Sequence, residues 1–224
     1  MSYAFFDLDG TIVRPDTQLV FAKHVLRTHP WRAVLFLPFL CALPLMFAKL
    51  LGSHQMKRLF LAYLCGLRPT HIDQLARDFA ENTFPAYCYP ELLAEIERHR
   101  REGRTLILNT ASPDFYARHV ARVLGFDHCI ATPLEITDPM PLVPEIDGPN
   151  NKRQAKLPHM AHLLPNSFDP QHPTRFPDSY AYTDSIVDLP LLACAEHNVL
   201  VNPKPNLLAA APKNATVLTP SSPI

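Results

Sequence analysis

The sequence predicts an α/β protein with a doubly wound parallel sheet (a Rossmann-like core) and an α-helical cap inserted after the first strand. Short apolar runs alternate with helical patterns along most of the 224-residue chain, as is typical of a parallel sheet with helices on both faces. Acidic or hydroxyl residues follow three of these runs, where open α/β sheets bind their ligands. A helical stretch interrupted by prolines follows the first run at once.

The elements follow in chain order. Buried strands are expected over residues 3–6, 105–108, 129–132, 179–183 and 199–201. Helices are expected over residues 17–67, 91–102, 115–124, 154–164 and 186–195. Pro30, Pro38 and Pro44 divide the first helical stretch, because proline removes a helix hydrogen bond. The tail from Pro212 is expected to be loosely held.

Charge is balanced overall but unevenly distributed. The chain has 21 basic and 21 acidic residues, which argues against a dedicated nucleic-acid binder. Between Arg14 and Arg68, however, eight basic residues accompany one acidic residue, a net charge of +7. Residues 33–48 inside this stretch carry no charge and are shorter than the ~20 residues that span a bilayer. We therefore expect a kinked helical pair, with an anionic membrane surface as a candidate partner for residues 31–51.

The cysteines and the N-terminus indicate a cytoplasmic protein. The five cysteines include no CxxC pair, so reduced and mostly buried thiols are expected. Met1 leads directly into an apolar run without a basic leader. The expected location is the cytoplasm, extending to a peripheral position on the inner membrane surface if the basic, apolar stretch contacts lipid.

Asp7 and Asp9 in FFDLDGTIV stand at the end of the first expected strand. Two carboxylates at this spacing suit a divalent cation with oxygen ligands. Alternatively, one of them attacks an electrophile while the other handles protons. An acidic loop that caps a helix is the plain structural alternative.

Three later segments add to this pair. Thr110 and the Ala111 amide follow the second strand, where a hydroxyl and free N–H groups suit a phosphate. Lys152 supplies a cation after Gly148. Asp184 and Asp188 follow the fourth strand in YTDSIVDLPLL. Each has a separate structural explanation, as a helix cap or a solvated charge, but their joint order favours one site.

With these motifs the chain resembles the haloacid dehalogenase-like phosphatases, in the branch that includes phosphoserine phosphatase. The resemblance covers nearly the whole chain and rests on DLDGT, Thr110, a downstream lysine and TDSIVD. It implies a core of residues 1–15 and 87–224 and a cap of residues 16–86. It also implies a phosphomonoesterase that uses Mg²⁺ and forms an aspartyl-phosphate.

The resemblance assigns a role to each matching residue. Asp7 is the implied nucleophile, and Asp9 the acid that protonates the leaving group and then activates water. Thr110, the Ala111 amide and Gly10 are assigned to the phosphate, and Lys152 to charge neutralisation. Asp184 is expected to bind Mg²⁺ with Asp7 and the Asp9 carbonyl, Asp188 to orient Lys152 or a metal-bound water, and Asp16 to contact substrate or cap a helix.

Two positions depart from the family pattern or leave a choice. Thr183 stands where the family usually has glycine, and its β-branched side chain restricts the backbone. Lys156 lies four residues after Lys152. We favour Lys152 as the family lysine, because it follows the Gly-Pro-Asn-Asn turn.

The cap composition bears on the substrate. Its basic, apolar run resembles bacterial phosphatidylglycerophosphatase C, which implies a lipid phosphate. The alternatives are that the run packs the cap helices or forms a dimer interface, with a small soluble monoester such as phosphoserine or histidinol phosphate as substrate. A phosphotransferase and a catalytically inactive membrane-binding module are further alternatives. The sequence leaves the oligomeric state open.

Overall fold

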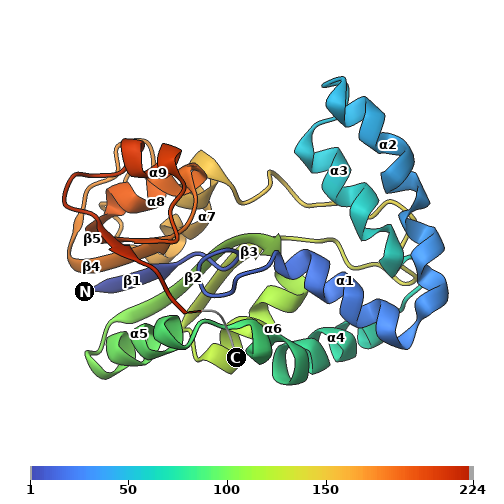
Figure 1. Cartoon of the computed structure of the whole chain (residues 1–224), viewed down its shortest axis with the longest axis horizontal. Helices are drawn as coiled ribbons and strands as arrows, with labels where there is room; N and C mark the ends of the chain where they lie inside the picture. The colour runs from blue at the N-terminus through green and yellow to red at the C-terminus, as the bar shows by residue number, and fades with distance from the viewer. Residues whose placement is uncertain (1, 222–224) are drawn as a thin grey trace.

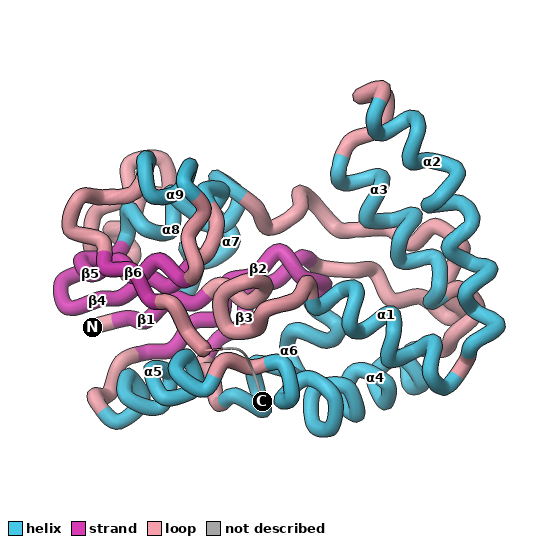
Figure 2. Tube along the Cα trace, viewed as in Figure 1, coloured by secondary structure: helices cyan, strands magenta, loops and turns pink. Residues whose placement is uncertain are grey.

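A six-stranded parallel sheet forms the centre of the molecule (Figures 1 and 2). The structure is a computed structural model that describes residues 2–221. Its strands are β1 (Tyr3–Phe6), β2 (Thr105–Pro113), β3 (His128–Thr132), β4 (Phe176–Thr183), β5 (Ala195–Val201) and β6 (Thr216–Leu218). They lie in the order β3-β2-β1-β4-β5-β6, and every neighbouring pair is parallel. The predicted fold class is confirmed.

Helices cover both faces of this sheet (Figure 1). The helices of these covering layers are α5 (Pro90–Arg101), α6 (Asp114–Leu124), α7 (Lys156–Met160), α8 (Leu189–Cys194) and α9 (Pro205–Ala210). Phe5 packs in the core with α7, α8 and α9, whereas Phe6 packs in the core with α5 and α6. Alternate residues of a strand point to opposite faces, so β1 is apolar throughout and all four of its residues are buried.

A helical segment lies between β1 and α5 and extends away from the sheet (Figure 1). Its α-helices are α1 (Thr17–Thr28), α2 (Leu37–Phe47), α3 (Ser53–Phe60) and α4 (Pro69–Asp78), linked by the shorter turns η1 (Pro30–Phe36), η2 (Leu61–Leu64), η3 (Phe79–Thr83) and η4 (Phe84–Tyr87). The helix α1 ends at Thr28, two residues before Pro30, and Pro44 lies inside α2. The interruption expected at Pro30 is therefore observed, and Pro38 stands at the start of α2, whereas the interruption expected at Pro44 was wrong, because α2 continues past it to Phe47.

Backbone hydrogen bonding joins the two ends of this segment. Val13 forms an isolated antiparallel bridge with Cys88. The Tyr89 N–H donates to the Ile12 carbonyl at 2.9 Å. We call these four residues the neck. The chain thus enters and leaves the helical segment at one point, while the boundary predicted at residue 86 stays a prediction.

Two sequence predictions need correction. The tail from Pro212 is not loose throughout: β6 pairs with β5, and the Ser221 N–H donates to Glu91 Oε1 at 3.0 Å. The single helix expected over residues 154–164 is instead α7 flanked by the turns η5 (Arg153–Ala155) and η6 (Ala161–Leu163). Pro158 lies inside α7, and proline disfavours a long uninterrupted helix.

The stretch from Pro30 to Phe47 is apolar and largely exposed. Its length of 18 residues and mean hydropathy of 1.6 make it a candidate membrane span by composition alone. Only 11% of it is buried, so it is not an ordinary core helix. The large apolar side chains exposed on it and just beyond it are Trp31, Val34, Leu37, Leu40, Leu45, Phe47 and Leu50. We call this set the apolar face.

Candidate active site

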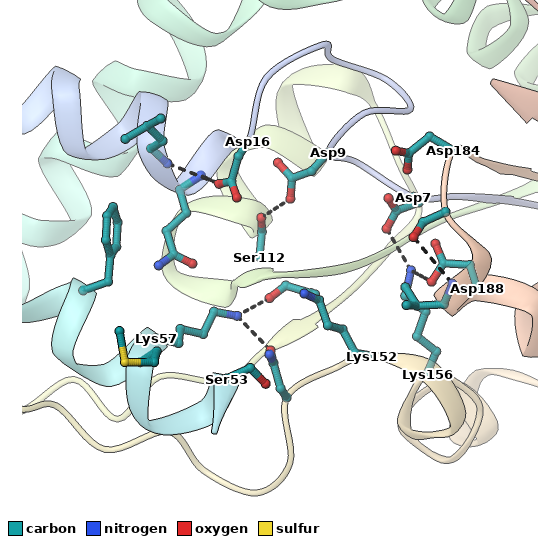
Figure 3. A pocket seen from close by; sticks show the side chains of 18 of the residues that line it. Asp7, Asp9, Asp16, Ser53, Lys57, Ser112, Lys152, Lys156, Asp184 and Asp188 are labelled. Carbon is teal, nitrogen blue, oxygen red and sulfur yellow. Dashed lines mark hydrogen bonds and ion pairs between the residues drawn. The ribbon is translucent and has the colours of Figure 1, made fainter. Parts of the chain in front are cut away.

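A cavity of about 590 Å³ lies between the carboxyl ends of the central strands and the helices α2 and α3 (Figure 3). Charged and polar side chains come from the strand ends and from the loop before α7. They are Asp7, Asp9, Ser112, Asn150, Lys152, Lys156, Asp184, Ser185 and Asp188. Apolar side chains come mainly from the helical segment and include Leu19, Phe39, Met46, Met56 and Phe60. The helical segment also contributes Asp16, Gln18, Ser53 and Lys57, so a charged floor faces a roof that is apolar in part.

Lys156 links two aspartates at the floor of this cavity. Its Nζ lies 2.8 Å from Asp7 Oδ1 and 2.7 Å from Asp188 Oδ1. It also donates to the Asn109 carbonyl at 2.9 Å. Burial alone would lower the pKa of Lys156, but the two carboxylates outweigh burial and raise it. Lys156 is therefore a fixed ammonium ion against Asp7.

The strands and α7 hold this group in place. Asp7 directly follows β1, and its N–H donates to the Tyr182 carbonyl of β4 at 3.0 Å. Asp188 accepts a hydrogen bond from Thr183 Oγ1 at 2.7 Å. The threonine that replaces the usual glycine thus uses its hydroxyl to orient Asp188. Burial raises the pKa of Asp7, and Asp188 and Asp9 add to it, whereas the ammonium of Lys156 lowers it and favours the carboxylate.

Asp184 approaches the same end of the sheet from β4, and Gly10 makes room for it. Gly10 has a φ of 80°, and a Cβ built there would lie 2.3 Å from Asp184 Oδ2. Only glycine adopts this backbone conformation readily while leaving that space empty. The Asp184 N–H donates to Thr11 Oγ1 at 3.0 Å. Gly10 is thus required by the close approach of Asp184, and its predicted contact with phosphate stays a prediction.

Asp9 faces the helical segment. Its Oδ2 accepts from Ser112 Oγ and its Oδ1 from the Thr17 N–H, both at 2.6 Å. Burial and the negative charge of Asp16 raise its pKa. Asp16 lines the cavity and also caps α1, accepting from the Gln18 N–H at 2.9 Å. The position of Asp16 is therefore compatible with both predicted roles, a helix cap and a residue that faces the substrate cavity.

The segment after β2 differs in detail from the prediction. Thr110 is fully buried, and its Oγ1 accepts from the Ser112 N–H at 3.0 Å. Ala111 and Ser112 line the cavity. The strand continues to Pro113, and α6 begins at Asp114, so Thr110 lies within the strand rather than at a transition into the helix. Its predicted phosphate contact stays a prediction.

The lysine beside Asp7 is Lys156, and the expectation that Lys152 occupies this position was wrong. Lys152 lines the cavity, but the ion pairs with Asp7 and Asp188 belong to Lys156. Arg153 between them has a φ of 56°, so the chain turns before α7 begins. This turn brings Lys156 beneath the strand ends.

Lys57 was not predicted as part of the site. It lies in α3 of the helical segment, yet its Nζ donates to the Ala111 carbonyl and to Asn150 Oδ1, the latter at 2.8 Å. Asn150 is 93 residues away in the sequence, so no local pattern could indicate this contact. Lys57 connects the helical segment to the strand ends.

The donors fit a hard divalent cation such as Mg²⁺. Within residues 2–221 no three His, Cys, Asp or Glu side chains are grouped closely enough to hold a metal by themselves. Mg²⁺ usually takes only one or two carboxylates and keeps several waters. Asp7 and Asp184 could supply the carboxylates, and the Asp9 backbone carbonyl could supply a further oxygen. Negative charge is in excess here, because one ammonium faces Asp7 and Asp188 and no ion pair engages Asp184 among the described residues. Burial, with Asp188 and Asp9, raises the pKa of Asp184 to about 6.

The parallel sheet and its strand-end carboxylates define a hydrolase of one family. A model of the haloacid dehalogenase-like hydrolases matches residues 4–193, and the chain belongs to this family. Protein CicA of Caulobacter vibrioides is 30% identical over 196 residues, which are 85% of this chain and 82% of that protein. A Mycobacterium tuberculosis protein named as a probable phosphatase is 28% identical over 212 residues, 89% of this chain and 68% of that protein.

Solved structures share the fold. The crystal structure of a protein of unknown function from Bordetella pertussis has a TM-score of 0.76 at 23% identity, covering 97% of this chain and 98% of that one. A probable phosphoserine phosphatase from Vibrio cholerae has a TM-score of 0.67 at 16% identity, covering 98% and 62%. The fold is thus that of the phosphoserine phosphatase branch. Together with the family and the named relative, it supports a phosphatase.

Proposed function

We propose that this chain is a Mg²⁺-dependent phosphomonoesterase that acts through an aspartyl-phosphate, with a lipid phosphate such as phosphatidylglycerophosphate as its substrate. The observation that carries the proposal is the cavity itself, which joins Asp7, Lys156 and Asp184 to the apolar side chains of α2 and α3. A phosphate monoester fits the charged end, and an apolar substituent fits the other. Residues 16–86 serve as the cap, and the neck supports this division.

Asp7 is the nucleophile in this proposal. One of its carboxylate oxygens attacks phosphorus, and the bond from phosphorus to the ester oxygen breaks. Lys156, 2.8 Å from Asp7 Oδ1, keeps its positive charge beside the transferring group. Fixed charges that need no reorganisation are the main source of catalysis in such transfers.

Asp9 handles the protons. It donates a proton to the departing ester oxygen, a role that burial favours because it raises the pKa of Asp9. The resulting carboxylate then accepts a proton from the water that attacks the phosphorus of the aspartyl-phosphate. Inorganic phosphate leaves, and Asp7 and the protonated Asp9 are regenerated. Ser112 and Thr17 hold the two oxygens of Asp9 during this sequence.

Mg²⁺ is the proposed cofactor, held by Asp7, Asp184 and the Asp9 carbonyl. When bound, it supplies positive charge that lets a phosphate dianion approach the carboxylates. Asp188 has no place in this ligand set, because its Oδ1 pairs with Lys156. It positions the lysine.

The apolar face argues for a substrate presented at a membrane surface. The helix α2 contributes Phe39 and Met46 to the cavity, whereas Leu37, Leu40 and Phe47 of the same helix are exposed. One helix therefore connects the cavity with the outside apolar surface. The net charge of +7 between Arg14 and Arg68 favours an anionic membrane. The proposed location is peripheral, on the cytoplasmic side of the membrane.

Phosphate release in the presence of Mg²⁺ tests the activity. The substrates are phosphatidylglycerophosphate and phosphatidate, compared with phosphoserine and histidinol phosphate. We expect release from the lipids and none from the Asp7→Asn variant. Preference for a soluble monoester would keep the chemistry and refute the lipid assignment. Release that requires an added acceptor would indicate a phosphotransferase instead.

Sedimentation with vesicles tests the membrane contact independently. We expect the protein to sediment with vesicles rich in anionic lipid and to remain in solution with neutral ones. Replacing Leu40 and Phe47 by serine should abolish sedimentation, whereas replacing the exposed Leu208 of α9 should not. Equal sedimentation of both variants would refute the role of the apolar face.

A further inference from the structure

Two lysines in the cavity lie apart from the group around Asp7. Lys57 and Lys152 both line the cavity together with Ser53 and Asn150. In Figure 3, Lys57 and the group of Asp7, Lys156 and Asp188 lie at opposite ends of the site. The proposed reaction uses neither Lys57 nor Lys152. Their presence in the same cavity therefore needs its own explanation.

Lys57 forms no ion pair with the described carboxylates, although Asp9 and Asp16 lie near enough to act on its charge. Its Nζ contacts only neutral oxygens: the Ala111 carbonyl, Thr132 Oγ1 at 3.4 Å and Asn150 Oδ1 at 2.8 Å. Among the described carboxylates, none forms an ion pair with Lys57 or with Lys152. A charge held away from water without a partner is costly. Such a charge beside a substrate cavity is stabilised when an anion binds.

The repulsion between the two lysines supports this interpretation. Burial and the nearby charge of Lys152 lower the pKa of Lys57 to about 8, and they outweigh the opposite effect of Asp9 and Asp16. The two lysines that line the cavity therefore repel each other. An anionic group bound near them would relieve the repulsion and pair with both.

We infer that Lys57 and Lys152 form a second anion subsite, which selects phosphate monoesters carrying another negatively charged group at some distance from the scissile phosphate. This inference rests on the proposed function and deepens it. The second group could be the phosphodiester of a lipid head group or a carboxylate of a soluble ester, and both share the chemistry of a singly charged oxyanion. Apolar side chains line the same cavity, which favours a substrate whose two anionic groups are joined to an apolar portion.

Alkyl phosphates of increasing length, ending in either a carboxylate or the isosteric carboxamide, test the subsite. At the length that spans the cavity, we expect the carboxylate to have the higher kcat/KM, by about ten- to hundredfold, the range for a hydrogen bond to a charged group. Lys57→Met should remove this preference by lowering kcat/KM for the carboxylate far more than for the carboxamide. Lys152→Met should reduce the preference, and Lys23→Met on the exposed side of α1 should retain it.

A purely structural role of Lys57 gives a different result. If Lys57 only fastens α3 to Ala111, its replacement should lower kcat/KM equally for the carboxylate and the carboxamide, which would overturn the subsite. The subsite would also be overturned if the wild-type protein showed no preference for the carboxylate at any alkyl chain length. Head-group selectivity is then compared with short-chain phosphatidylglycerophosphate and phosphatidate, which distinguishes the lipid source of the anion from the soluble one.

Calorimetry separates this inference from the proposed function. Binding of both compounds is measured to Asp7→Asn and to Asp7→Asn combined with Lys57→Met, neither of which needs turnover. A carboxylate preference that depends on Lys57 supports the subsite even if wild type releases no phosphate. Hydrolysis without any such preference refutes the subsite and leaves the phosphomonoesterase intact.

Discussion

Replacing Lys156 by methionine should destabilise the protein strongly. The side chain is 1% exposed and pairs with Asp7 and with Asp188, which is also 1% exposed. Methionine fills a similar volume but leaves Asp188 buried without its cation. Breaking a buried pair by removing one partner costs about 3–5 kcal/mol, of a total stability of roughly 5–15 kcal/mol for a typical domain. The variant should therefore still fold, with a reduced free energy of unfolding.

Urea unfolding at pH 7 measures this loss. With a denaturant dependence of about 2–3 kcal/mol per molar urea, the midpoint should fall by roughly 1–2 M. Lys152→Met is the matched control, because Lys152 is exposed and such surface changes usually lie within about 0.5 kcal/mol. Phosphate release should be lost with Lys156→Met and largely retained with Lys152→Met on substrates without a second anion. Equal midpoints for the two variants would refute the ion-pair reasoning.

The other predictions concern the remaining residues of the site. Asp7→Asn should abolish phosphate release without shifting the unfolding transition by more than a few degrees, and activity within tenfold of wild type would exclude Asp7 as the nucleophile. Asp184→Ala should raise the Mg²⁺ concentration needed for half-maximal activity at least tenfold, and an unchanged titration would remove Asp184 from the metal site. Gly10→Ala should lower stability by at least about 1–2 kcal/mol, the cost of a left-handed backbone for a residue with a Cβ, and should also weaken Mg²⁺ activation, because the new Cβ would displace Asp184; thermal unfolding and metal titration measure the two effects. Because the pKa of Lys57 is lowered to about 8, the carboxylate preference should decline as pH rises through 8. The free energy of unfolding should rise between that pH and the higher pKa of Lys57 in the unfolded chain, because the unfolded chain binds more protons in this range. A carboxylate preference that stays constant up to pH 10 would contradict this assignment.

The sequence predicted the sheet well because its strands are short apolar runs that end in chemically distinctive residues. Asp7 and Asp184 follow β1 and β4, and adjacent parallel strands bring their carboxyl ends to one edge. Strand β6 was missed because Thr216–Leu218 is only three residues long and mostly exposed. Its stability comes from pairing with β5 rather than from its own pattern.

The site was predicted in part for similar reasons. The choice between Lys152 and Lys156 depends on the turn at Arg153, which spacing along the sequence does not reveal. Lys57 reaches the strand-end site through hydrogen bonds of its own side chain, across long sequence separations. A basic residue between Met56 and Phe60 in an amphipathic helix was the available signal, but solvated helix faces give the same pattern.

The neck bears on how related proteins can differ in substrate specificity. Because the Tyr89 N–H bonds to the Ile12 carbonyl and Val13 pairs with Cys88, the whole helical segment begins and ends at the same place. Loop-closure entropy grows only slowly with length, so a shorter or longer segment could be exchanged there at little thermodynamic cost. The strand ends that hold Asp7 and Asp184 keep their register under such an exchange. A graft made at the neck should therefore transfer specificity between relatives as a single module when it keeps the Thr17 N–H that donates to Asp9.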